Sequence, residues 1–74
     1  MRLYTTQLQI DRTTVPYLVS MEGGRLLFRP CSATEIDAPI FWVSKESGEW
    51  KPININDDVL VQQILDGIQD KGLG

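Results

Sequence analysis

The chain has 74 residues, a net charge of −3, one cysteine and no histidine. A chain of this length forms one domain near the lower size limit of a hydrophobic core, because it buries only about 60% of its unfolded surface. One cysteine excludes an intramolecular disulfide, and the lack of histidine removes the commonest general base and a common zinc ligand. We therefore expect a protein that is not an enzyme and that holds no metal or cofactor.

The charge is unevenly distributed along the chain. Residues 1–30 carry four arginines against two carboxylates, whereas residues 31–74 carry three lysines against eight carboxylates. The acidic balance disfavours binding to nucleic acid or to an anionic membrane, because counterion release requires clustered basic residues. No apolar run approaches the roughly 20 residues that span a bilayer. The single thiol and the absence of an apolar signal segment after Arg2 predict a cytoplasmic location.

Alternating apolar and polar residues predict a strand over residues 3–10 and a second strand over residues 14–21. A two-residue turn at Asp11 and Arg12 would place the apolar residues of both strands on one face. The predicted cross-strand pairs are Leu8 with Val15, Thr6 with Tyr17, and Tyr4 with Val19. The agreement between turn and alternation predicts a β-hairpin in this register.

Two consecutive glycines predict the next turn, before a strand over residues 25–30. Two placements are open, Glu22-Gly23 and Gly23-Gly24, and both put Leu26 and Phe28 on the face of the apolar residues in the preceding strand. The opposite face of this strand carries Arg25, Leu27 and Arg29.

An irregular connection follows this strand. Within it, Ser32 and Glu35 have the spacing of a capping box, which predicts one helical turn.

A second apolar hairpin is predicted from a strand over residues 39–45 and a strand over residues 49–55. A three-residue loop over residues 46–48 ends on glycine, as the common type I turn with a left-handed glycine requires. This loop would set Lys45 opposite Glu49, which is a favourable pair of opposite charges.

In that register both faces of the hairpin are apolar. One face would carry Trp42 and Trp50, together with neighbouring apolar residues. The other face would carry Phe41, Val43 and Ile53. Trp42 and Trp50 are therefore either core residues or anchors for another chain, because tryptophan is enriched among the residues that dominate binding energy.

A C-terminal helix is predicted over residues 57–71, with Asn56 as its N-cap. Its apolar residues recur at helical spacing and form one stripe. The stripe contains Leu60, Val61, Ile64, Leu65 and Ile68. Gly72 followed by Leu73 is typical of a helix C-terminus with an apolar contact.

These elements predict an α+β fold, an antiparallel β-meander of five strands with a C-terminal helix packed on one face. One helix, about 10 Å wide, covers roughly two strands of a flat sheet. Either the sheet curls around the helix, or part of an apolar face contacts another chain. The element order resembles single-stranded nucleic-acid-binding modules of the Pur-alpha and Whirly type, which pair as dimers. That resemblance implies a binding sheet, whereas the acidic charge opposes it.

The expected function is a non-catalytic protein-interaction module or accessory subunit that self-associates through an apolar sheet face. Two alternatives stay open: a single-stranded nucleic-acid-binding domain that uses the arginine-bearing strand, and a small hydrolase working through carboxylates. The sequence identifies no small-molecule substrate. The candidate partner-binding residues are Trp42, Trp50, Phe41, Val43, Ile53, Arg25, Leu27 and Arg29.

Overall fold

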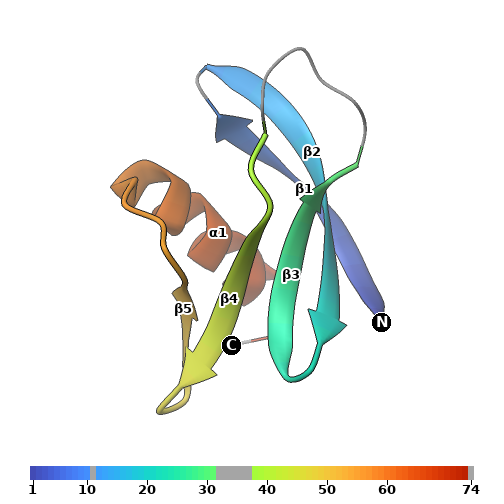
Figure 1. The fold of residues 1–74 in the computed structure, drawn as a ribbon, viewed down its shortest axis with the longest axis vertical. Coiled ribbons are helices and arrows are strands. Elements are labelled where there is room, and N and C mark those ends of the chain that lie inside the picture. Colours follow the sequence, from blue (N-terminus) through green and yellow to red (C-terminus); the bar gives the residue numbers. More distant parts are fainter. Residues whose placement is uncertain (11, 32–37, 74) are drawn as a thin grey trace.

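The computed structural model describes residues 1–10, 12–31 and 38–73. They form one antiparallel sheet whose strands follow the order of the sequence, with a helix at the C-terminal end (Figure 1). The elements are β1 (Arg2–Ile10), β2 (Thr13–Glu22), β3 (Arg25–Pro30), β4 (Phe41–Glu46), β5 (Glu49–Pro52) and α1 (Asp58–Asp70). The predicted meander of five strands followed by a helix is therefore confirmed.

The hairpin of β1 and β2 has the predicted register. The pairs are Leu8 with Val15, Thr6 with Tyr17, and Tyr4 with Val19. Among these residues, Leu8, Val15, Tyr17 and Val19 are buried in the core. Of the two predicted turn residues, Asp11 lies outside the described residues and Arg12 has a positive φ of 67°. The apolar alternation and the short turn thus act together to set the register.

The turn between β2 and β3 is formed by Gly23 and Gly24, because Glu22 pairs with Arg25. Both glycines have positive φ, 58° and 80°, as a type I′ turn requires. The structure therefore selects the second of the two predicted placements. Phe28 pairs with Val19 in this register, and it lies on the buried face, as both placements predicted.

The connection from β3 to β4 leaves the sheet at Cys31, whose backbone N–H donates to the carbonyl of Pro16 at 2.8 Å. The predicted capping box of Ser32 and Glu35 lies outside the described residues.

The predicted three-residue loop of the last hairpin is wrong. Glu46 pairs with Glu49, which leaves a two-residue turn of Ser47 and Gly48 with φ values of 51° and 82°. Such a type I′ turn matches the twist of the flanking strands. That match outweighs the cost of about 1 kcal/mol for placing Ser47, which is not a glycine, in the left-handed region.

The shorter turn changes the register by one residue and moves one tryptophan to the other face. Lys45 pairs with Trp50 and not, as predicted, with Glu49. Trp50 therefore shares a face with Val43, whereas Trp42 lies on the opposite face. The prediction that Trp42 and Trp50 share a face is wrong. β5 also ends at Pro52, before the predicted residue 55.

The helix α1 begins one residue later than its sequence suggests. Its N-cap is Asp57, not Asn56, and the Asp57 carboxylate accepts hydrogen bonds from the N–H groups of Val59 and Leu60 at 3.0 and 3.2 Å. At the other end, Gly72 has a φ of 72°. The predicted apolar stripe is confirmed by its buried members Leu60, Ile64 and Ile68.

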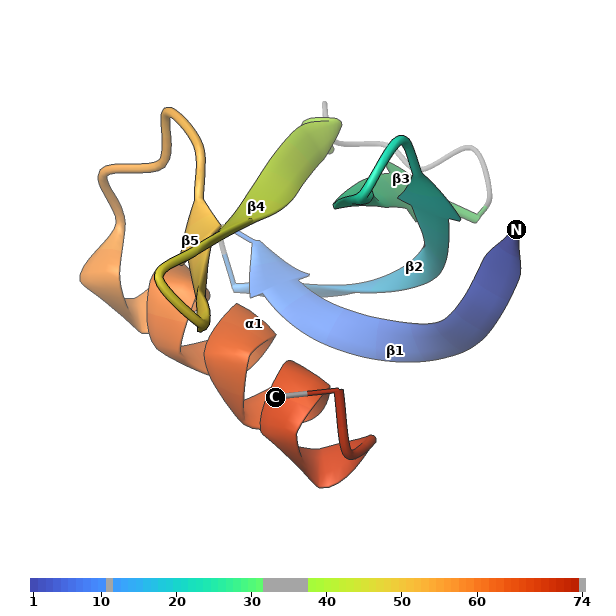
Figure 2. The same cartoon turned by 90° about the horizontal axis from the view of Figure 1, so that it is seen from below.

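The sheet curls so that its two edge strands both meet the helix. α1 packs against β1 and β5, and Figure 2 shows the strands wrapping around one side of the molecule. The Gln63 amide donates to the Gln9 carbonyl and accepts from the Gln9 N–H at the edge of β1. On the side of β5, the Trp50 indole N–H donates to the Leu73 carbonyl at 3.0 Å. Curling resolves the mismatch between one narrow helix and five strands.

The sheet thus has an inner face, which packs on α1 and holds the core, and an outer face turned away from the helix. Among the described residues, no helix is long and apolar enough to cross a membrane.

Candidate functional site

The outer face brings arginines and a tryptophan together from strands far apart in sequence. Residues paired across neighbouring strands point to the same side of a sheet. One row of such pairs runs across four strands, from Arg2 through Ser20 and Leu27 to Trp42. In a neighbouring row, Leu18 pairs with Arg29.

Leu27 and Trp42 form the apolar part of the outer face. Leu27 is only 9% exposed, although within the described chain α1 packs against β1 and β5 and not against β3. Trp42 is half-buried beside it, and the guanidinium carbon of Arg25 lies 4.8 Å from the centre of the Trp42 ring. This distance allows a cation–π contact, which positions both side chains.

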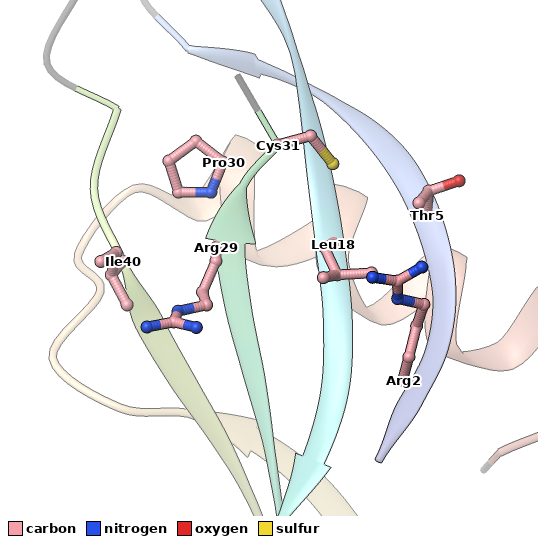
Figure 3. Close-up of a pocket in the computed structure, with 7 residues that line it drawn as sticks. All are labelled: Arg2, Thr5, Leu18, Arg29, Pro30, Cys31 and Ile40. Atoms are coloured by element: carbon pink, nitrogen blue, oxygen red, sulfur yellow. The ribbon is translucent and has the colours of Figure 1, made fainter. Parts of the chain in front are cut away.

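A hollow of about 440 Å³ lies at the other end of the same face, between Arg2 of β1 and Arg29 of β3 (Figure 3). Leu18 lies on the strand between them and forms part of the apolar lining. The lining residues are Arg2, Thr5, Leu18, Arg29, Pro30, Cys31 and Ile40. Two guanidinium groups beside apolar side chains suit a ligand that is both anionic and partly apolar.

A second hollow, of about 320 Å³, lies beside Trp42 and shares Ile40 with the first. The Ile40 side chain is 59% exposed, which is unusual for a large apolar residue. Ile53 and Asp57 also line this second hollow. The two hollows therefore adjoin at Ile40, one of them beside Arg2 and Arg29 and the other beside Trp42.

On the outer face, Arg2 and Arg29 form no ion pair in the part of the chain that the structure describes, whereas Arg25 lies opposite Glu22. The one ion pair in that part of the chain joins Lys51 and Glu46, at 3.8 Å. The cross-strand neighbours of Arg2 and Arg29 are the uncharged residues Ser20 and Leu18. The carboxylates of the helix, Asp58, Asp66 and Asp70, are exposed on an element that packs against the inner side of the sheet. The part of the outer face around Arg2 and Arg29 is therefore locally basic, although the same face also carries Glu22, Glu46 and Glu49.

The structure divides the predicted partner-binding residues between the two faces. Arg25, Leu27, Arg29 and Trp42 lie together on the outer face, and Ile53 lines the hollow beside Trp42.

The remaining three predicted residues belong to the inner face. Phe41 and Val43 are core residues, 5% and 0% exposed. Trp50 packs against the core and bonds to Leu73. These three residues therefore contribute to the core, and Phe41 also lines the hollow beside Trp42.

Sequence reasoning missed Arg2 as a member of the site. The predicted first strand began at residue 3, so that Arg2 had no position on a face. Extending the β1–β2 pairing without a shift would have set Arg2 opposite Met21, on the inner face. The register shift between Arg2 and Tyr4 sets Arg2 opposite Ser20 instead, on the outer face, so the pairing alone could not have found it.

Among the described residues, neither the two hollows of the outer face nor a third beside Trp50 brings two carboxylates together. The Arg2–Arg29 hollow is lined by none, the Trp42 hollow by Asp57, and the third hollow, of about 460 Å³, by Glu49. No group of three or more Asp, Glu, His or Cys residues in the described chain is arranged to hold a metal ion. Cys31 is a free, exposed thiol.

Comparison with known proteins identifies no relative: no protein-family model matches the chain, and no curated protein or solved structure matches it significantly.

Proposed function

We propose that this protein is a non-catalytic protein-interaction module that binds another chain through the outer face of its sheet. One observation carries the proposal: Trp42, Leu27 and three arginines gather on the face that the helix does not cover. Tryptophan and arginine dominate the energy of protein interfaces, and an apolar centre with a charged rim is their usual arrangement.

The partner is either a second copy of this chain, as the sequence predicts, or a different protein. Both fit the small size of the domain, because a chain this short gains stability when part of its surface is covered. We place the module in the cytoplasm, because Cys31 is a free, exposed thiol and such thiols persist in a reducing compartment.

A second candidate function is the binding of single-stranded nucleic acid. It gains support from the position of Trp42, since sheets bind single strands through basic side chains and stacking aromatic rings. The Arg25 guanidinium already lies over the Trp42 ring, however, and the chain carries a net charge of −3. Protein binding is therefore the better-supported function.

The test is site-specific photo-crosslinking in cells that make the protein. A photoreactive amino acid replaces Ser44, which lies on the outer face beside the Trp42 row, or Gln62, which is exposed on α1. We expect a discrete adduct from position 44, none from position 62, and loss of the adduct when Trp42→Ala is added. The mass of the adduct distinguishes a second copy from a different protein.

Equal labelling from both positions, or no adduct from position 44, would contradict the proposal. The folded state of each variant is checked by its circular dichroism spectrum, so that an absent adduct is not the result of unfolding.

A further inference from the structure

We infer that the partner of the outer face is an acidic, partly apolar segment of a different protein, with its carboxylates held between Arg2 and Arg29. The inference rests on the proposed interaction function and names the chemistry of the partner.

The Arg2–Arg29 hollow combines charged and apolar side chains. Guanidinium groups present a planar set of donors that matches a carboxylate in a bidentate manner. Here two of them project from β1 and β3 on either side of the strand that carries Leu18 (Figure 3). Pro30 and Ile40 extend the apolar lining. A glutamate or aspartate flanked by apolar residues satisfies both parts of this surface.

The charges of Arg2 and Arg29 would complement those of an acidic partner. Throughout the described part of the chain, no carboxylate lies within ion-pair distance of Arg2 or Arg29. Both arginines are exposed, so that their donors face solvent. An acidic segment would supply carboxylates to both arginines, and approach to this end of the face would be favoured by electrostatic attraction.

Beyond the hollow, the surface leads through Ile40 to Trp42. Ile40 lines both hollows and connects the arginines to Trp42. An extended segment with its carboxylates between the arginines could therefore place a neighbouring apolar side chain against Ile40 and Trp42. Apolar contact of this kind supplies most of the affinity, whereas the charges give orientation and specificity.

The same observations disfavour two other occupants. A second copy related by a two-fold axis through this face would present the identical patch, so that Arg2, Arg25 and Arg29 of both copies would gather in one interface. Single-stranded nucleic acid would require an open aromatic face, and the Arg25 guanidinium covers one face of Trp42.

The experiment is an NMR titration of the ¹⁵N-labelled full chain with a short blocked peptide of Glu-Leu-Glu-Gly repeats. Matched probes are the Gln-Leu-Gln-Gly peptide and a single-stranded oligothymidylate of similar length. The two tryptophans provide an internal control, because Trp42 lies on the outer face and the Trp50 indole N–H is bonded to Leu73 on the inner side.

We expect the glutamate peptide to shift the Arg2 and Arg29 side-chain N–H signals and the Trp42 indole signal, and to leave the Trp50 indole signal in place. The glutamine peptide should bind about tenfold more weakly or worse, since charge-assisted hydrogen bonds are lost.

Paired variants test the role of the two arginines. The double variant Arg2→Gln/Arg29→Gln should weaken binding of the glutamate peptide about tenfold or more. The control Arg12→Gln/Lys71→Gln removes the same charge from exposed positions that do not line the hollow, and it should change the affinity less than about threefold.

Four results would overturn the inference. Equal binding of the two peptides would exclude an acidic partner, while shifts at Trp42 would still support the interaction face. Tighter binding of oligothymidylate would assign the face to nucleic acid. Shifts at Trp50 in place of Trp42 would put the peptide elsewhere. No shift with any probe would exclude this partner chemistry, whereas the crosslink at position 44 decides the proposed function independently.

Discussion

Two tyrosines on the inner face differ in what their hydroxyl groups contact. The Tyr17 hydroxyl donates to the Pro39 carbonyl at 2.7 Å, across the connection from β3 to β4. The Tyr4 hydroxyl is also shielded from solvent, but it has no hydrogen-bond partner among the described residues. A buried polar group without a partner retains the full penalty of leaving water, whereas a bonded one recovers it.

Removing each hydroxyl should therefore change stability in opposite directions. We expect Tyr4→Phe to raise the free energy of unfolding by about 1 kcal/mol and Tyr17→Phe to lower it by about 1 kcal/mol. Urea denaturation followed by tryptophan fluorescence measures both. A loss of stability in Tyr4→Phe as large as that in Tyr17→Phe would show that the Tyr4 hydroxyl has a partner in solution.

At the scale of the element, the N-terminus of α1 depends on one carboxylate. Asp57 satisfies two of the free N–H groups at the start of the helix, through Val59 and Leu60. Asn56 is an equally good capping residue by type, but it lies one position too early. The buried stripe beginning at Leu60 sets where the helix starts, because Leu60 must face the core.

Truncation of the two neighbouring residues should separate their roles. Asp57→Ala is expected to lower the free energy of unfolding by about 1 kcal/mol, and Asn56→Ala by less than about 0.3 kcal/mol. Both values come from urea denaturation at neutral pH, and amide hydrogen exchange at Val59 and Leu60 reports the cap directly. Faster exchange in Asn56→Ala than in Asp57→Ala would contradict the assignment.

At the scale of the molecule, the curled sheet encloses a core that contains ionisable phenols. Desolvation by burial raises the pKa of Tyr4 and of Tyr17 above the ordinary value of 10.0. In the unfolded chain both phenols lose their protons at their ordinary pKa, whereas in the folded protein they stay protonated at higher pH. The unfolded state therefore releases protons first, and stability falls as the pH rises above about 10.

The expected outcome is alkaline destabilisation that depends on these phenols. Tyrosine ionisation should leave the free energy of unfolding unchanged below about pH 9. Above about pH 10 it should lower that free energy. The decline should be shallower in Tyr4→Phe than in the parent protein, because one of the two titrating groups is removed. An unchanged decline in that variant would assign the effect to other groups, such as the lysines.

Local sequence predicts the order of the strands and the helix, and it predicts which face of β3 carries Arg25, Leu27 and Arg29. Alternation over residues 3–10 and 14–21, with a short turn between them, leaves one register that buries the apolar residues. The same reasoning placed Arg25, Leu27 and Arg29 on the face opposite Phe28, because side chains alternate along any strand. Local pattern is sufficient there, since each consequence involves residues close along the chain.

Only the tertiary structure decided how the two tryptophans are used. A two-residue turn and a three-residue loop differ by one residue, and this difference moves Trp50 from the face of Trp42 to the face of the core. Local propensity favoured the loop that ends on glycine, whereas the twist of the sheet and the burial of Trp50 against Leu73 favour the shorter turn.

The sequence by itself therefore determined the order of the elements, the first register and the arginine face of β3. The tertiary structure decided the curl of the sheet, the face taken by α1 and the gathering of Arg2, Arg29 and Trp42 on the outer face. The physical reason is that these features depend on packing between strands distant in sequence. Their free energy comes from the shared core and not from any one segment.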